Sequence, residues 1–228
     1  MTYYVGLVRP LQADADSVLP AGRRNSGTFY RRHGKRITDL GLLLPFLPIL
    51  LLVVLVLAAV IALDGGRPFY SQMRVGRNGR LFRLWKLRTM VADADARLQA
   101  HLDSDPNAAL EWQHTQKLRH DPRITRAGRF LRRSSLDELP QFFNVLRGEM
   151  SIVGPRPMLP EQRAMYSSLD YYEVAPGVTG PWQVSDRNGT TFAARAAYDT
   201  EYNRTLSLGE DLRLIGRTFS AVLGCTGL

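Results

Sequence analysis

The sequence predicts a mainly helical α+β domain that carries a short β-hairpin or small sheet and is mounted on a bent N-terminal membrane helix. Three observations predict this fold class: an uncharged run from Leu40 to Leu63, an Asn78-Gly79 turn between alternating apolar and polar residues, and apolar residues at helical spacing in the second half of the chain. The 228 residues suit one medium-sized domain with an appendage.

The uncharged run predicts a helix that enters a membrane. As a straight helix it would be about 36 Å long, enough to cross a hydrocarbon core of about 30 Å. Pro45 and Pro48 interrupt the run, and each favours a kink because proline lacks the backbone donor. Basic residues flank the run on both sides, and basic flanks prefer the cytoplasmic side of a membrane. The pattern therefore favours a re-entrant helix, with a plain single span as the alternative.

This helix divides the chain into three predicted parts. Residues 1–34 form a polar, flexible extension, residues 35–64 form the re-entrant membrane helix, and residues 65–228 form a cytosolic domain docked on the membrane interface. The basic residues beside the helix are placed to meet anionic lipid headgroups at that interface.

Local patterns predict the structure of the cytosolic part. Residues 65–90 are typical of a hairpin. The polar residues 91–119 predict a helix or a helix pair, with Asp93 and Asp95 on a solvated face. Further expectations, in chain order, are helical structure over 124–150, an extended or turned Gly154-Pro155-Arg156-Pro157, a turn bracketed by Pro176-Gly177 and Gly180-Pro181, and helical structure from Phe192 to Leu223.

Charge and composition narrow the partners. The formal net charge of +9 favours anionic partners such as phosphorylated substrates, lipid headgroups or nucleic acid. Aromatic residues do not interleave with the arginines as a base-stacking platform requires, so we expect no nucleic acid. With Cys225 as the only cysteine there is no intramolecular disulfide, and the four histidines form no zinc-ligand pattern.

Two adjacent acids, Asp137 and Glu138, are the candidate catalytic residues. They follow Arg132 and Arg133 at an apparent helix start, where Ser135 and Glu138 also fit a simple capping box. A helix start would hold a carboxylate ionised, and an ionised carboxylate can attack phosphorus. A neighbouring carboxylate can bind Mg²⁺ against a diphosphate.

Arg156 is the candidate phosphate-binding arginine. It lies between two prolines, which restrict the backbone on both sides of it. A guanidinium held in this way can donate two parallel hydrogen bonds to a phosphate.

The chain resembles the bacterial monotopic phosphoglycosyltransferases, the initiating sugar transferases of capsule, exopolysaccharide and O-antigen synthesis. The resemblance runs from Lys35 to the C-terminus and rests on five motifs that occur in family order. They are Lys35-Arg36-Ile37-x-Asp39; Phe82-x-x-x-Lys86-x-Arg88-Thr89-Met90; Ser135-Leu136-Asp137-Glu138-Leu139-Pro140-Gln141 with Asn144-Val145-Leu146-x-Gly148; Ser151-x-Val153-Gly154-Pro155-Arg156-Pro157; and Pro176-Gly177-x-Thr179-Gly180-x-Trp182-Gln183-Val184-x-x-Arg187-Asn188.

The resemblance implies a reaction and its residues. Asp137 matches the nucleophile that attacks the sugar-bearing phosphate of a UDP-sugar and expels UMP, and Glu138 matches the Mg²⁺-binding acid. Polyprenol (undecaprenyl) phosphate then takes the sugar phosphate, and Arg156 matches the phosphate-contacting arginine. Weaker candidates for phosphate or uridine contacts are Lys86, Arg88, Arg132 and Arg187, for which headgroup binding or plain surface charge is the alternative. Trp182 suits either uracil stacking or packing.

The resemblance also implies a location and a class of donor. The enzyme would act on the cytoplasmic face of the bacterial inner membrane, with residues 65–228 as its catalytic domain and a homodimer possible. The polar insert at 91–123 is similar to that of hexose-transferring members and favours galactose or glucose. Two departures from the family stand out: the apolar segment lacks a central Ser-Pro break, and Asp186 replaces the glycine before Arg187.

Two other functions fit some of the same residues. A membrane-bound Mg²⁺-dependent hydrolase of nucleotide or polyprenyl diphosphates would use similar arginines and acids with water as the attacking group. A non-enzymatic basic adaptor would dock on an anionic membrane and would need no acid pair. The transferase is the preferred hypothesis because it accounts for the acids, the arginines and the membrane helix together.

Overall fold

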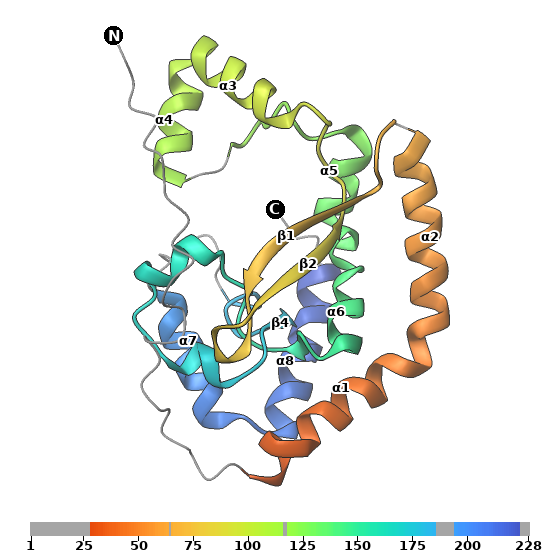
Figure 1. The fold of residues 1–228 in the computed structure, drawn as a ribbon, viewed down its shortest axis with the longest axis vertical. Coiled ribbons are helices and arrows are strands. Elements are labelled where there is room, and N and C mark those ends of the chain that lie inside the picture. Colours follow the sequence, from red (N-terminus) through yellow and green to blue (C-terminus); the bar gives the residue numbers. More distant parts are fainter. Residues whose placement is uncertain (1–27, 64, 116–117, 186–193, 224–228) are drawn as a thin grey trace.

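The computed structural model describes residues 28–63, 65–115, 118–185 and 194–223. They form a mainly helical fold with two small two-stranded sheets, in agreement with the predicted fold class (Figure 1). The helices are α1 Lys35–Leu43, α2 Leu47–Leu63, α3 Ala94–Ser104, α4 Pro106–Thr115, α5 Arg126–Arg133, α6 Gln141–Arg147, α7 Ala194–Thr205 and α8 Leu208–Leu223. The strands are β1 Phe69–Val75, β2 Leu81–Leu87, β3 Ser151–Val153 and β4 Gly177–Thr179.

The apolar run forms the predicted bent helix. Helical structure is continuous from Tyr30 to Leu63, but a 3₁₀ turn at Leu44–Phe46 separates α1 from α2. Figure 1 shows α1 along the base of the molecule and α2 rising along its side. The bend falls at Pro45, whose ring lacks the N–H that a straight helix would use. Among the described residues this is the one helix long and apolar enough to cross a membrane.

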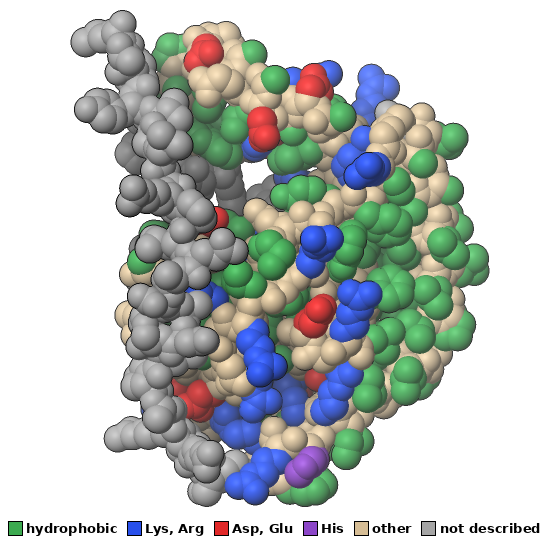
Figure 2. All heavy atoms as spheres, in the orientation of Figure 1, with side chains coloured by type: hydrophobic (Ala, Val, Ile, Leu, Met, Phe, Trp, Pro, Cys, Tyr) green, Lys and Arg blue, Asp and Glu red, His purple; other side chains and the backbone are tan. Residues whose placement is uncertain are grey.

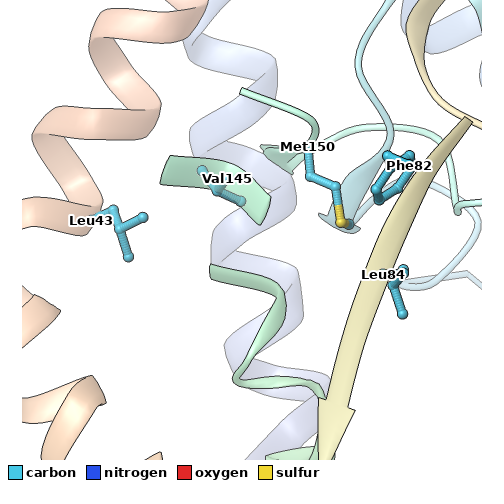
Figure 3. Close-up of a cluster of buried hydrophobic side chains, with 5 residues drawn as sticks. All are labelled: Leu43, Phe82, Leu84, Val145 and Met150. Atoms are coloured by element: carbon cyan, nitrogen blue, oxygen red, sulfur yellow. The ribbon is translucent and has the colours of Figure 1, made fainter. Parts of the chain in front are cut away.

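One face of the bent helix packs on the rest of the protein. Leu43 joins Phe82 and Leu84 of β2, Val145 of α6 and Met150 in a buried cluster (Figure 3). The other face of α2 is open, and Figure 2 shows apolar side chains along that edge of the molecule. The most exposed of them include Leu52, Leu55 and Leu63. The helix is therefore two-sided, with a protein-facing stripe and a large uncovered apolar face.

A buried polar cluster fixes α1 to the C-terminal half, and we call it the α1 clamp: Lys35, Asp39, Ser151, Tyr202 and Asp211. Lys35 Nζ lies 2.9 Å from Asp211 Oδ2 and 3.7 Å from Asp39 Oδ1. Asp39 Oδ1 accepts from Ser151 Oγ at 3.0 Å, and Tyr202 donates to Asp211 Oδ1 at 2.7 Å. These contacts hold the start of the bent helix against β3, α7 and α8.

Several basic residues beside the apolar run have partners inside the protein. Arg36 donates to the carbonyls of Val145 and Leu146 at the end of α6, and Arg31 binds Asn203. Together with Lys35 of the α1 clamp, these side chains are engaged by the protein rather than pointing to lipid headgroups, as we had expected of them. Their charges satisfy buried acids and helix-end carbonyls instead.

The hairpin and the polar helix pair follow the sequence-based predictions. Strands β1 and β2 are antiparallel, and the turn between them places Asn78 and Gly79 at φ values of 56° and 74°. Both residue types tolerate this left-handed backbone, which a tight hairpin turn requires. Helices α3 and α4 form the pair predicted for residues 91–119, with Asp93 and Asp95 exposed. The C-terminal stretch is likewise helical, as α7 and α8, with residues 192–193 outside the described part.

Two local predictions were wrong. The helix predicted over 124–150 is interrupted after α5, where Ser135 has a φ of 56° and its side chain makes no capping hydrogen bond. The turn predicted at 176–181 contains strand β4, which pairs in parallel with β3. A side chain at Gly154 or Gly177 would collide with the backbone of the other segment, so these glycines permit the close pairing.

The α1 clamp yields a prediction about stability. Lys35→Met leaves Asp39 and Asp211, which are 4% and 1% exposed, without their cation. We expect a loss of about 3–5 kcal/mol, seen as a lower unfolding temperature of the detergent-purified protein. Arg32→Met, at an exposed neighbouring position, is the matched control. Equal unfolding temperatures for the two variants would contradict the clamp.

Candidate functional site

The two acids sit on a short 3₁₀ turn between α5 and α6. After Ser135 reverses the chain with its left-handed backbone, Leu136–Glu138 form the turn and Pro140 leads into α6. Asp137 is buried at 7% exposure, and Glu138 is half-buried. The two acids therefore lie together in a short turn before α6, and not in the first turn of a longer helix.

Lys86 joins the two acids. Its Nζ lies 2.7 Å from Glu138 Oε1 and 3.5 Å from Asp137 Oδ2. On β2, Lys86 follows Phe82 and Leu84 at spacings of two, so it continues the strand face whose first members are in the core. The same face of the strand therefore runs from the hydrophobic core to the acid pair, where it places the ammonium of Lys86.

A cleft opens beside this acid pair. It lies between the hairpin, the acid turn and the β3–β4 sheet. Its polar lining consists of Arg74, Lys86, Glu138, Gln141, Arg156 and Gln183. Two arginines and a lysine facing one carboxylate give the cleft a net positive lining, which suits a phosphorylated ligand.

Burial governs the charge state of Asp137. Desolvation raises the pKa of Asp137 above its usual range, and the neighbouring Glu138 raises it further. Lys86 and Arg132 oppose this by favouring the ionised carboxylate. We expected a helix start to favour the ionised carboxylate of Asp137. Instead the turn is only three residues long, and burial of the side chain acts on its pKa in the opposite direction.

The other predicted arginines divide between the cleft and structural roles. Arg156 lines the cleft as predicted. Arg132 donates to Thr89 Oγ1 at 2.9 Å and acts on Asp137 only through its charge. Arg88 donates to the carbonyl of Ile61 at 3.0 Å, near the end of α2, and is not in the cleft lining. Arg187 and Asp186 lie outside the described residues.

The geometry can be compared with known proteins. The model of the family described as bacterial sugar transferase matches residues 30–225. The chain belongs to this family. The family membership confirms the resemblance found in the sequence, and it confirms that the chain is of the transferase class of enzyme.

Three relatives illustrate the family. The exopolysaccharide production protein ExoY of Sinorhizobium fredii is 46% identical over 173 residues, which is 75% of this chain and 76% of the relative. A UDP-galactose-lipid carrier transferase of Erwinia amylovora is 44% identical over 191 residues, 83% of this chain and 40% of the relative. An undecaprenyl-phosphate glucose phosphotransferase of Komagataeibacter xylinus is 40% identical over 188 residues, 76% of this chain and 32% of the relative. The chain thus spans about three quarters of ExoY and less than half of the other two.

A magnesium role in this sugar transferase is compatible with Glu138. Mg²⁺ is typically bound by one or two carboxylates together with substrate phosphates, and the Glu138 carboxylate lines the cleft. Within the described ranges, no group of three or more His, Cys, Asp or Glu side chains is placed to form a metal cage. The donor set therefore fits an ion that arrives with a phosphorylated ligand better than a permanently caged one.

Sequence reasoning missed the role of Arg74 in this sugar transferase and left two roles open for Trp182. Arg74 was counted only as part of a basic flank, yet it lines the cleft from β1. Trp182 is buried, with the guanidinium carbons of Arg195 and Arg156 at 3.9 Å and 5.8 Å from its ring centroid. Its burial favours the packing interpretation over an exposed stacking platform. The one sequence signal for the role of Arg74 was its position two residues after Gln72, on the same face of the hairpin strand.

Asp199 is a second buried acid behind this wall of the cleft. It accepts a hydrogen bond from the Tyr166 hydroxyl on Oδ2, while Oδ1 has no hydrogen-bond partner. Burial raises the pKa of Asp199 to about 7, although the Tyr166 bond and the charge of Arg195 act to lower it. No function for this residue followed from the sequence.

The raised pKa predicts how stability depends on pH. An unfolded Asp loses its proton near pH 4, so between about pH 4 and pH 7 only the folded state keeps the Asp199 proton. Stability from this group therefore falls as the pH rises through that window. Asp199→Asn removes the effect, and above pH 7 its unfolding temperature should exceed the parent's by about 3 °C or more. Parallel pH profiles for parent and variant would show that Asp199 titrates normally.

Proposed function

We propose that this chain transfers a sugar 1-phosphate, galactose or glucose 1-phosphate, from a UDP-sugar to polyprenol (undecaprenyl) phosphate and releases UMP. The observation that carries the proposal is the bridging of Asp137 and Glu138 by Lys86 at the edge of a cleft that Arg156 also lines. The names of two relatives support the donor and acceptor classes, since one is a UDP-galactose-lipid carrier transferase and the other an undecaprenyl-phosphate glucose phosphotransferase.

The first step forms a covalent intermediate on Asp137. A carboxylate oxygen attacks the phosphorus that carries the sugar, the bond to the bridging oxygen breaks, and its electron pair leaves with UMP. Lys86 favours the ionised form of Asp137, which the attack requires, against the opposing effect of burial. Arg156 offsets negative charge on the diphosphate within the cleft. Glu138 would hold Mg²⁺, which supplies further charge neutralisation when bound.

The second step returns the carboxylate. An oxygen of polyprenol phosphate attacks the same phosphorus, the aspartyl–phosphorus bond breaks, and the sugar diphosphate product remains attached to the lipid. Atoms and charge balance without water, so a cleft that favours phosphates over water serves the transfer. A hydrolase with the same residues would instead admit water in this step.

The bent helix supports a membrane position for the reaction. The uncovered apolar face of the bent helix suits contact with lipid. Helix α6 follows the acid turn and packs on α1 and β2, so the acid turn lies close to the bent helix. We propose that residues 35–64 are re-entrant at the cytoplasmic face of the inner membrane and that residues 65–228 are the catalytic domain. Polyprenol phosphate and a cytosolic donor would then meet at headgroup level.

Release of UMP tests the proposed reaction. Detergent-purified protein with Mg²⁺ and polyprenol phosphate should release UMP from UDP-galactose or UDP-glucose only when the lipid phosphate is present. Asp137→Asn should lower the rate by about 10³-fold or more, since the nucleophile is lost. Asp93→Asn, at an exposed acid on the helix pair, should keep the parent rate.

Other outcomes of this assay favour the other functions. Release of phosphate products without lipid would indicate the hydrolase. Absence of UMP from every donor would favour the adaptor hypothesis. Full transfer activity in Asp137→Asn would reject Asp137 as the nucleophile.

Labelling of cysteines tests the re-entrant geometry. In a Cys225→Ser background, Arg32→Cys and Arg67→Cys place single thiols at exposed positions on either side of the bent helix. A membrane-impermeant maleimide should label both thiols from the cytoplasmic side only, in sealed vesicles of each orientation. Labelling of the two positions from opposite sides would establish a single span.

A further inference from the structure

Three arginines come together at one side of the cleft, and we call them the arginine cluster: Arg74 and Arg156, which line the cleft, and Arg195, which lies against Trp182 beside them. The guanidinium carbons of Arg156 and Arg195 lie 5.8 Å and 3.9 Å from the centroid of the Trp182 ring. Arg74 Nη1 donates at 3.1 Å to the carbonyl of Pro157, the residue after Arg156. Strand β1, the Gly154–Pro157 segment and α7 thus bring one arginine each to the same place.

The arginine cluster is electrostatically costly as it stands. Burial is the main cause that lowers the pKa of Arg74 and of Arg195, and the charge of Arg156 is the second cause. The pKa of Arg195 falls to about 10. Arg74 donates only to uncharged oxygens, those of Pro157 and of the Gln72 side chain, and its buried Nε has no acceptor. Neither Arg74 nor Arg156 forms an ion pair with a carboxylate of the described residues.

Protein interiors tolerate such repulsion where an anion neutralises it. Asp199 gives Arg195 partial compensation, because the ionised carboxylate favours its charged form. Asp199 lies behind the cluster with Tyr166 and does not line the cleft. The side of the cluster that faces the cleft therefore presents positive charge to a ligand.

We propose that Arg74 and Arg195, together with Arg156, bind the phosphate of the nucleoside monophosphate that leaves in the first step. This inference rests on the proposed function. Arg74 and Arg156 line the same cleft as Lys86 and Glu138, so one ligand can contact both pairs of residues. A nucleoside diphosphate sugar has two phosphates. The one that carries the sugar belongs at Asp137, and the other extends toward the arginine cluster.

This placement assigns the arginines a chemical task. When the carboxylate attacks, the electron pair of the broken bond moves onto the bridging oxygen, and negative charge grows on the nucleotide phosphate. Guanidiniums placed around that phosphate offset the growing charge and stabilise the leaving group. Lys86 acts on the carboxylate of Asp137 instead, so the lysine and the arginines have different tasks.

Calorimetric binding of UMP to the detergent-purified full chain tests the inference. Arg74→Gln and Arg195→Gln should each weaken UMP binding by about 10-fold, because each removes a charge-assisted contact. Arg74→Lys and Arg195→Lys keep the charge without the fork and should bind with intermediate affinity. Arg83→Gln is the matched control, because Arg83 is an exposed residue of β2 and does not line the cleft.

Transfer kinetics complete the test. The Gln variants should keep the parent KM for polyprenol phosphate while their rate of UMP release falls, a split that a general loss of folding would not produce. Unchanged UMP affinity in both Gln variants would overturn the inference even if the parent is an active transferase. Conversely, a parent that transfers nothing to lipid refutes the proposed function, while weaker UMP binding in the variants would still support the anion site.

Discussion

The contact of Lys86 with Asp137 and Glu138 is the interaction on which the site depends. Burial alone would leave Asp137 protonated more readily, and a second carboxylate beside it adds to that tendency. One ammonium between the two acids opposes both effects and holds the carboxylates together. Earlier residues of β2 pack in the hydrophobic core, and this apolar packing fixes the strand that positions Lys86 at the site.

Packing also links the bent helix to the acid turn. The α1 clamp and the cluster around Leu43 fix the bent helix to β2, β3 and α6, and β2 and α6 also frame the acid turn. The depth of the helix in a bilayer would therefore set the height of Asp137 above it. A rigid connection of this kind suits the proposed reaction, in which one substrate is a lipid phosphate and the other is a soluble nucleotide sugar.

Local features were predictable from the sequence because their causes are local. Pro45 bends its own helix, and Asn78-Gly79 turns its own hairpin. The five family motifs likewise identified the family, which the comparison with known proteins confirms. Features set by tertiary contacts were not predictable: the β3–β4 pair needs Gly154 beside Gly177, and the raised pKa of Asp137 needs the burial that the whole fold provides.

The basic residues show the same division. As a sequence they form two clusters beside an apolar run, which predicts lipid contact. The fold assigns Arg36 to helix-end carbonyls, Arg88 to the end of α2, and Arg74 to the cleft. The positions of charged residues in the sequence cannot distinguish these roles. An arginine that caps a helix and an arginine that faces a phosphate can have the same neighbouring sequence. The acids behave alike, since Asp199 and Asp211 acquire their environments only in the fold.

Intact-protein mass spectrometry tests the central claim, that Asp137 carries the sugar phosphate between donor and acceptor. Purified protein would be mixed with Mg²⁺ and UDP-galactose or UDP-glucose without any lipid, and then digested to locate an adduct. We predict one hexose phosphate on the peptide that contains Asp137, and its disappearance when polyprenol phosphate is added. Release of UMP without an adduct, or an adduct on another residue, would contradict the role of Asp137.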